Sequence, residues 1–350
     1  MQGFASVLAG MPFAALLIGP DERIHAANDA AREMLGKGIE GRHFLTALRQ
    51  PDVLEAVEQT QRDHQARRTT YQTSESGRDS VFQVHVAHVD AGAAARGVLV
   101  VFEDLTEREQ AAQMRRDFVA NVSHELRTPL TALMGFIETL QGPARHDEVA
   151  IDRFLGIMAR EAARMERLVH DLLSLSRVEG EERIRPREPV DLSGVIGTVM
   201  TMLRPLARER GCSIHFRAAE GFVVPGNADQ LQQVFTNLVE NAIKYGGTEN
   251  RVDITLESHA RDATLRMPAI VVSVRDRGPG IDPLHIPRLT ERFYRVDTHR
   301  SREMGGTGLG LAIVKHIVNR HRGTMEITSS DEGVTTFAVS LPVIAGNQAL

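Results

Sequence analysis

The stretch FVANVSHELRTPL, residues 118–130, decides both the fold and the chemistry that this 350-residue chain predicts. It begins an apolar series whose members mostly follow one another at steps of three and four, as in a helix packed in a bundle. The series runs Val119, Val122, Leu126, Leu130, Leu133, Ile137 and Leu140. His124 precedes Leu126 by two residues, so its imidazole should lie on the solvent side of the helix.

The residues around His124 could support a nucleophilic role for the imidazole. At neutral pH one ring nitrogen is free to attack, Glu125 could hold the opposite N–H, and Thr128 could position a water molecule. Pro129 has no amide hydrogen, so the helix should bend there. Taken alone, however, an exposed histidine on a helix is more often an ordinary surface residue.

A second amphipathic helix follows Gln141-Gly142-Pro143, which should end the first one. Its apolar positions are Phe154, Met158, Ala162, Met165, Val169, Leu172 and Leu175. Two helices cannot enclose a core. We therefore expect the hairpin to pair with that of a second copy in a four-helix bundle, which makes the protein a homodimer. Packing of the hairpin against other domains of the same chain is the alternative.

The helix expected at 229–245 carries Asn237, Asn241 and Lys244 near one face and apolar residues on the other. Amide oxygens suit Mg²⁺, which takes few protein ligands besides phosphate and water, and lysine neutralises phosphate charge. Asparagine is a poor helix former, so two of them four residues apart favour a binding role over an ordinary polar face.

Two segments rich in glycine complete a predicted nucleotide site. Asp276-Arg277-Gly278-Pro279-Gly280 follows an apolar strand, where the carboxylate could accept a hydrogen bond from an adenine amino group. Gly305-Gly306-Thr307-Gly308-Leu309-Gly310-Leu311 leads into a helix and offers free amides to phosphate. This loop lacks the lysine of a Walker loop and the βαβ unit of a dinucleotide site. Between the two segments, residues 282–304 could form a mobile lid with Arg295 facing the phosphates.

These strings, in this order over residues 118–343, resemble the H, N, G1, F and G2 boxes of sensor histidine kinases. The resemblance implies a Bergerat-type ATP-binding domain that uses ATP and Mg²⁺. It implies autophosphorylation of His124, with Glu125 as the base, Thr128 associated with phosphatase activity, and Asn241 as the metal ligand. The expected nucleotide-binding residues are Asn237, Glu240, Asn241, Lys244, Tyr245, Asp276, Gly278, Gly280, Arg295, Gly306, Thr307, Gly308, Leu309 and Gly310. One departure is Thr290, where the family more often has an apolar residue such as Phe.

Residues 1–104 predict a separate small α+β domain. The apolar run 4–19 is too short and too interrupted for a membrane span, and predicts a short helix that leads into a buried strand. Strand, turn, strand and helix should occupy 13–35, and the alternating segment 81–90 should pair with 98–104 in a closing hairpin. This domain resembles a PAS sensor domain.

The chain as a whole predicts a multidomain α+β protein. We expect the PAS-like domain at 1–104, a helical connector at 105–117, the dimeric phosphotransfer hairpin at 118–184 and the ATP-binding domain at 190–343. After a linker at 185–190, the last domain should be a two-layer α/β sandwich with a largely antiparallel sheet. Its expected helices are 192–210, 229–245 and 309–322, and its expected strands are 213–217, 251–257, 269–275, 324–329 and 334–341.

Composition excludes several other classes of protein. The single Cys212 excludes an intrachain disulfide and a cysteine-based zinc site. With 41 basic and 46 acidic residues and a net charge of -5, the chain has no basic excess that would indicate nucleic-acid binding. We expect a cytoplasmic protein, whose association with a membrane would need another protein or a segment outside this sequence.

The expected function is that of a two-component sensor kinase. ATP would phosphorylate His124, and an aspartate on the receiver domain of a response regulator would then take the phosphoryl group. The string FVANVSHELRTPLTAL and the order of the domains look most like those of the phosphate-regulon sensor kinases. An ATPase or a Ser/Thr kinase with the same ATP-binding fold is the alternative enzyme, and a signalling scaffold without catalysis is the non-enzymatic alternative.

Overall fold

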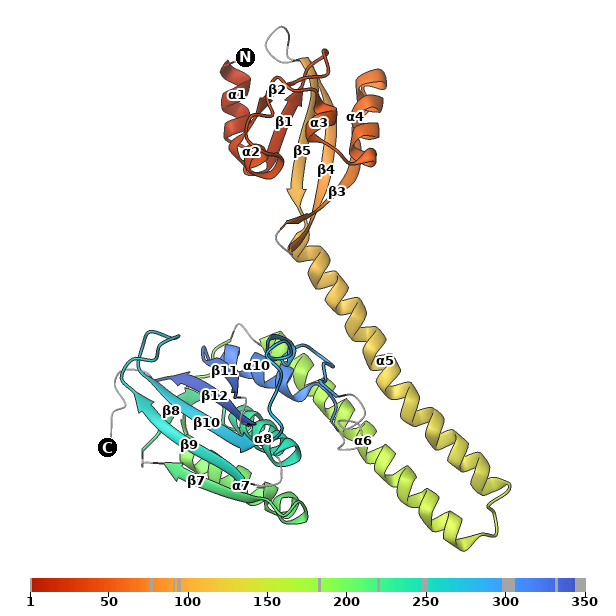
Figure 1. The fold of residues 1–350 in the computed structure, drawn as a ribbon, viewed down its shortest axis with the longest axis vertical. Helices are drawn as coiled ribbons and strands as arrows, with labels where there is room; N and C mark the ends of the chain where they lie inside the picture. The colour runs from red at the N-terminus through yellow and green to blue at the C-terminus, as the bar shows by residue number, and fades with distance from the viewer. Residues whose placement is uncertain are drawn as a thin grey trace. The chain divides into compact units, whose positions relative to one another are not determined.

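The computed structural model describes residues 2–75, 78–90, 92, 96–181, 184–218, 221–246, 251–297, 306–330 and 333–343. The chain, whose helices and strands are labelled in Figure 1, divides into two compact units, residues 1–120 and 121–350. Each unit has buried apolar residues of its own. No helix within the described ranges has both the length and the apolar character that a membrane crossing requires.

The first unit is built on one five-stranded antiparallel sheet. Its strands are β1 (Ala14–Ile18), β2 (Ile24–Ala27), β3 (Arg67–Glu75), β4 (Arg78–Asp90) and β5 (Arg96–Asp104), in the order β2-β1-β5-β4-β3. Its helices are α1 (Gln2–Ala9), α2 (Asp29–Leu35), α3 (Phe44–Ala47) and α4 (Pro51–Asp63). The opening helix, the buried strand after it and the closing hairpin of β4 with β5 are confirmed.

The sequence pattern does not predict strand β3, which pairs with β4 at the edge of the sheet. Its residues, RRTTYQTSE, include Tyr71 as the only large apolar side chain, and none of residues 67–74 is buried. An edge strand that is polar on both faces lacks the alternation by which a half-buried strand is recognised. The domain therefore has one more strand than predicted.

Strand β1 is buried on both faces. Leu16 and Ile18 face the main core, which lies between the sheet and helices α2, α3 and α4. Ala15 and Leu17 face a smaller cluster that includes Leu8 of α1. Because successive residues have apolar partners on opposite sides, the strand reads as an uninterrupted apolar run in the sequence.

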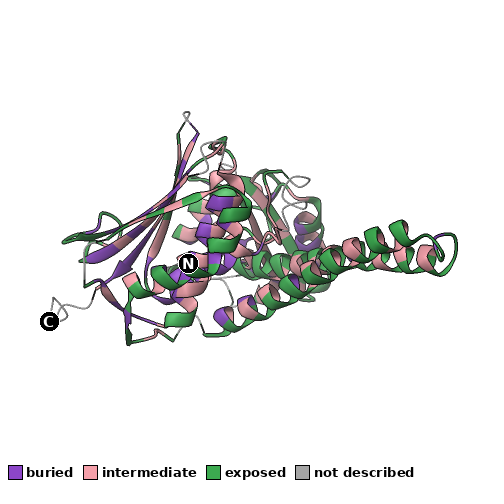
Figure 2. Cartoon of the chain, turned by 90° about the horizontal axis from the view of Figure 1, so that it is seen from below, coloured by how far each residue is buried: buried purple, intermediate pink, exposed green. Residues whose placement is uncertain are grey.

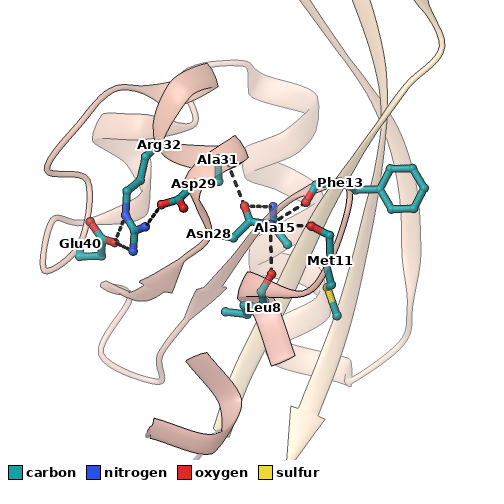
Figure 3. Close-up of polar contacts among 9 residues, drawn as sticks. All are labelled: Leu8, Met11, Phe13, Ala15, Asn28, Asp29, Ala31, Arg32 and Glu40. Atoms are coloured by element: carbon teal, nitrogen blue, oxygen red, sulfur yellow. Dashed lines mark hydrogen bonds and ion pairs between the residues drawn. The ribbon is translucent and has the colours of Figure 1, made fainter. Parts of the chain in front are cut away.

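Asn28 ties helix α1 to this sheet (Figure 3). Its buried side chain accepts hydrogen bonds from the amides of Ala15, in β1, and Ala31, in α2, at 3.0 Å each. Its amide nitrogen donates to three carbonyl oxygens that precede β1, those of Leu8, Met11 and Phe13, at 3.2, 3.4 and 2.7 Å. One side chain therefore caps the start of α2 and satisfies carbonyl groups at and after the end of α1.

We expect Asn28→Asp to destabilise the first unit by about 3 kcal/mol. The new carboxylate would still accept from the two amides, but it would place an oxygen against the carbonyl oxygens that the amide group now satisfies. Hydrogen exchange at the amides of β1, measured on the whole chain, reports the loss. Asp29→Asn is the matched control, because the side chain of Asp29 is 97% exposed. Equal exchange rates in the two variants would contradict this prediction.

The second unit contains a helical hairpin. Its arms are α5 (Thr106–Gln141), which begins before the boundary between the units, and α6 (Glu148–Glu181). The first arm ends at Gln141 as predicted, and most of the predicted helical connector forms the beginning of α5. Helix α5 continues through Pro129, so the missing amide hydrogen does not end it. Few residues of the arms are buried (Figure 2), namely Pro129, Leu168, Leu175 and Val178.

The rest of this unit is a two-layer α/β sandwich, as predicted (Figure 1). The sheet has the order β11-β12-β10-β9-β7 and is antiparallel except between β7 and β9. Its strands are β7 (Ser213–Ala218), β9 (Arg251–His259), β10 (Ala269–Arg277), β11 (Thr324–Ser329) and β12 (Val334–Pro342). The helices packed against it are α7 (Leu192–Glu209), α8 (Ala228–Tyr245) and α10 (Gly310–Arg320). All predicted elements here lie within two residues of the observed ones.

The prediction of a linker at 185–190 is wrong for its second half, because residues 188–190 belong to a strand. Strand β6 (Glu188–Asp191) pairs antiparallel with β8 (Val223–Gly226), which the sequence pattern does not predict either. Pro189 lies opposite Pro225 in this ladder. Because proline has no amide hydrogen, two prolines can lie opposite each other only at a position where neither backbone N–H is needed for the ladder. Prolines are usually evidence against a strand, so the sequence gives no sign of this pair.

Candidate functional site

His124 lies on the exposed surface of α5, in agreement with its spacing from the apolar series. Thr128, one turn further along, is also exposed, and its hydroxyl donates to the carbonyl oxygen of His124 at 3.2 Å. Val122 and Leu126 on the other side of the helix are half-buried. The imidazole and the threonine hydroxyl therefore share one exposed helix face.

The carboxylate of Glu125 connects the hairpin to the segment after β10. Its Oε2 accepts from Nη2 of Arg164, on α6, at 2.8 Å and from Nη2 of Arg295 at 3.4 Å. The three side chains are only 14%, 14% and 5% exposed, so their charges are weakly screened by water. Nη2 of Arg295 also donates to the Gly306 carbonyl oxygen at 2.6 Å. Arg295, the arginine predicted to face phosphate, thus contacts both the glycine loop and the hairpin.

Helix α8 presents its predicted polar face beside the same loop. Its apolar face is buried, including Val234, Phe235, Leu238 and Ala242, and its polar residues Asn237, Glu240, Asn241 and Lys244 are half-buried. The amide nitrogen of Asn237 donates to the carbonyl oxygen of Gly310 at 3.4 Å. Nζ of Lys244 lies 2.8 Å from Oε1 of Glu240.

The start of α8 is anchored by His321, a residue that no sequence motif indicates. His321 is 1% exposed. Its Nε2 accepts from the amide of Asn227, the N-cap of α8, at 3.0 Å. Its Nδ1 lies 2.7 Å from the carbonyl oxygen of Ile317, which can only accept, so Nδ1 carries the proton. Burial lowers the pKa of His321, in keeping with a neutral ring.

Asp276 ends the buried part of β10 next to the C-terminus of α8. It is 4% exposed, and burial raises the pKa of its carboxyl group to about 7, although a hydrogen bond from the amide of Gly278 opposes the shift. A Cβ on Gly278 would lie 2.5 Å from the carbonyl oxygen of Tyr245. Only glycine therefore allows the backbone at residue 278 to lie so close to the backbone of Tyr245, and this contact brings Asp276 and Tyr245 near each other.

The glycine loop is fastened to the lid segment at Gly308. The amide of Phe293 donates to the Gly308 carbonyl oxygen at 2.8 Å, and a Cβ on Gly308 would lie 2.8 Å from Cα of Phe293. With a φ of +73°, this position favours glycine on both counts. Leu309 is fully buried at the start of α10, and its amide donates to the Thr307 hydroxyl at 3.3 Å.

The described part of the predicted lid, residues 282–297, is folded around Tyr294. The Tyr294 hydroxyl lies 2.7 Å from Nδ1 of His285, and the guanidinium of Arg288 lies 4.3 Å from its ring centre. Arg288 ends a short 3₁₀ helix, η2 (Ile286–Arg288). Thr290, the departure from the family pattern, accepts from Nζ of Lys315 at 3.4 Å. Residues 298–304 of the predicted lid, and Gly305 of the glycine loop, lie outside the described residues.

Helix α6 contacts the α/β sandwich and the loops next to it at several points that the sequence does not predict. The Thr307 hydroxyl donates to Oδ2 of Asp171 at 2.7 Å, and Nη2 of Arg292 donates to Oε1 of Glu179 at 2.7 Å. Ser174 and Gln233 exchange hydrogen bonds through their side chains. Each contact joins segments far apart in the chain, which local patterns cannot connect.

The donor set fits a magnesium ion that is brought in with a nucleotide. No cluster of three or more His, Cys, Asp or Glu side chains suited to a metal ion occurs in the described part of the chain. Asn241, Asn237 and Glu240 nevertheless offer oxygen atoms on the half-buried face of α8. Mg²⁺ needs only one or two such ligands when phosphates and water supply the rest.

Three family models match the chain, in the order that its fold shows. They are a PAS fold over residues 8–110, a His Kinase A (phospho-acceptor) domain over 114–181, and a histidine kinase-, DNA gyrase B- and HSP90-like ATPase over 226–345. Fold and site thus define a protein with a PAS domain, a phosphoacceptor hairpin and an ATPase-type domain.

Comparison with individual relatives defines the family of the chain more narrowly. The sensor protein kinase WalK of Staphylococcus aureus is 34% identical over 324 residues, which cover 91% of this chain and 76% of the relative. The phosphate regulon sensor protein PhoR of Pseudomonas aeruginosa is 41% identical over 239 residues, which cover 68% of this chain and 52% of PhoR. The chain belongs to the sensor histidine kinases. It spans about half the length of PhoR.

A solved structure supports the fold over almost the whole chain. The histidine kinase ThkA, in complex with the response regulator protein TrrA, matches with a TM-score of 0.53 at 21% identity. The match covers 98% of this chain and 99% of that one.

Proposed function

We propose that this protein transfers the γ-phosphoryl group of ATP to His124 and then to an aspartate on a response regulator. The observation that carries the proposal is the contact of Glu125, the neighbour of His124, with Arg295 of the lid segment. This contact supports an approach of the nucleotide domain to the exposed histidine. Family membership supports the same reaction class.

The residues of the site suggest one role for each element. Asp276 would accept a hydrogen bond from the adenine amino group, while the amides of residues 306–310 and Lys244 would hold phosphate oxygens. Asn241 would contribute an oxygen ligand to Mg²⁺, which neutralises phosphate charge when bound. The predicted roles of Asn237, Glu240 and Tyr245 are to line the same pocket.

The chemical step would form a P–N bond to His124 as the bond between the γ-phosphorus and the β–γ bridging oxygen breaks. ADP leaves with the electrons of that bond, and the proton on the other ring nitrogen passes to Glu125 acting as base. Catalysis would rest on positioning and charge neutralisation, as is usual in phosphoryl transfer. The receiver aspartate would then displace the imidazole, and Thr128 would orient water for hydrolysis of the regulator's phosphate.

We also propose that two copies pair through the hairpin. Several large apolar side chains of the arms are more than two-fifths exposed in the single chain, namely Val119, Leu130, Met134, Ile137, Leu155, Val169 and Leu173. Burial of such a stripe against a second hairpin would give the four-helix bundle that two arms cannot form alone.

A role in phosphate regulation is the finer proposal, supported by the resemblance to PhoR. Its test is the phosphorylation state of His124 in cells grown with abundant and with scarce phosphate. A state that is the same in both would exclude phosphate as the stimulus.

The stability of the phosphate bond tests the proposed reaction. After incubation with ATP labelled on its γ-phosphate, the protein should carry label that acid removes and base does not, because a phosphoramidate hydrolyses in acid. The label should move to an isolated receiver domain. Acid-stable label would indicate a Ser/Thr kinase instead. ATP hydrolysis without label would indicate an ATPase, and absence of nucleotide binding would indicate a scaffold.

A further inference from the structure

An acidic side chain of the hairpin engages the glycine loop in this structure. Oδ2 of Asp171, on α6, accepts a hydrogen bond from the Thr307 hydroxyl at 2.7 Å. The same hydroxyl accepts from the amide of Leu309 at the start of α10. The carboxylate of Asp171 is therefore hydrogen-bonded to the part of the loop whose amides we expect to bind phosphate.

The surroundings of Asp171 extend to the polar face of α8. Its side chain is 21% exposed. Burial raises the pKa of its carboxyl group, while the positive charge of Lys244 opposes the rise and the negative charge of Glu240 adds to it. Asp171 therefore interacts electrostatically with Lys244, the lysine that we expect to neutralise the phosphate charge of ATP.

Two further carboxylates of the hairpin hold arginines of the lid segment. Glu125 pairs with Arg295 at 3.4 Å, and Glu179 pairs with Arg292 at 2.7 Å. Three acidic groups on one hairpin therefore engage a hydroxyl and two guanidinium groups around the glycine loop. Two of these donors, the Thr307 hydroxyl and Arg295, are among the groups that we expect an incoming triphosphate to use.

We propose that Asp171 is an autoinhibitory side chain, which competes with the phosphate groups of ATP for the glycine loop. In this resting arrangement the hairpin keeps the loop occupied, and ATP binding requires Thr307 to leave Asp171. A signal that shifts the hairpin relative to the loop would then raise ATP affinity without changing any residue of the nucleotide site. The inference rests on the proposed function, because it requires that ATP bind at this loop.

Replacing Asp171 tests the competition directly. Asp171→Ala removes both charge and acceptor and should tighten MgATP binding by roughly tenfold, and Asp171→Asn, which keeps an acceptor, by roughly threefold. The dissociation constant is measured by calorimetry on the whole chain. Initial autophosphorylation rates at ATP concentrations below that constant should rise in the same order.

Glu166→Gln is the matched control. It removes one negative charge from an exposed position on the same helix, and should leave the dissociation constant at its wild-type value. If wild-type protein binds MgATP and Asp171→Ala binds it no more tightly than Glu166→Gln does, the inference is wrong and the proposed function stands. If none of the proteins binds MgATP, the proposed function fails and the inference fails with it. Asp171→Asn, which preserves the shape of the side chain, decides the matter if the alanine variant does not fold.

Discussion

Replacement of His124 by glutamine should abolish incorporation of the γ-phosphate of ATP while leaving ATP binding nearly intact. Glutamine is close in size to histidine, but its amide nitrogen is not a nucleophile because its lone pair is delocalised. His124 is exposed on α5, whereas the expected nucleotide-binding residues lie on α8, at the end of β10 and in the segments that follow it, up to the start of α10. The change should therefore remove the acceptor and spare the pocket. Label retained on the protein and the dissociation constant of MgATP measure the two effects separately.

His146→Gln provides the comparison for this experiment. His146 lies in the turn between the two arms of the hairpin and is exposed, so the same substitution there should leave labelling unchanged. If the His124 variant takes up label as fast as the His146 variant, another residue accepts the phosphoryl group. If the His124 variant loses ATP binding, the histidine contributes to nucleotide binding as well as accepting the phosphoryl group.

The fold was predictable wherever its apolar residues follow one clear period. Both arms of the hairpin, helix α8 and the strands of the ATP-binding sheet have such a period. In helix α8 and the sheet the period reflects a buried face, whereas in the arms, where few residues are buried, it marks the apolar stripe that we propose a second hairpin covers. Strand β3 has no apolar face, and β6 contains Pro189. Both strands form because a neighbouring strand supplies backbone hydrogen-bond partners. The residues of β3 and β6 themselves do not indicate that such a neighbour exists.

The places of the predicted site residues on their helices, strands and loops could be expected from the sequence, whereas the contacts between those elements could not. The exposure of His124 follows from its position in a helical period. The glycines at 278 and 308 are explained by close backbone contacts within the fold. The pairs Glu125–Arg295 and Thr307–Asp171 join residues 170 and 136 positions apart. Such pairs depend on how two folded parts dock, which no local pattern expresses.

Asp276 provides the second large effect, on ATP affinity and on its dependence on pH. Asp276→Ala should weaken MgATP binding by about 100-fold, since a hydrogen bond to a buried charged group contributes about 3 kcal/mol. The carboxylate is the stronger acceptor for an adenine amino group, because charge-assisted hydrogen bonds are roughly twice as strong as neutral ones. Binding should therefore favour the ionised form of Asp276.

The direction of the pH effect follows from the raised pKa of this group. With a pKa of about 7 in the free protein, Asp276 is mostly protonated at pH 6, and ATP must displace the proton before the carboxylate can accept. Well below pH 7 each further pH unit then costs about 1.4 kcal/mol of binding free energy, whereas above pH 8 the group is already ionised and affinity levels off. MgATP affinity should accordingly rise by about fivefold between pH 6 and pH 7 and by about tenfold between pH 6 and pH 8.

The nucleotide itself also titrates near neutral pH, so the wild-type profile alone cannot identify Asp276 as the source of the effect. Asp276→Asn separates the two contributions, because asparagine keeps an acceptor oxygen but does not ionise between pH 6 and pH 8. Dissociation constants measured for both proteins over this range should converge at pH 6 and diverge towards pH 8, with the wild type binding more tightly. Parallel profiles would mean that the carboxyl group does not change its protonation on binding. In that case adenine would be recognised by backbone groups around residue 276 and not by its side chain.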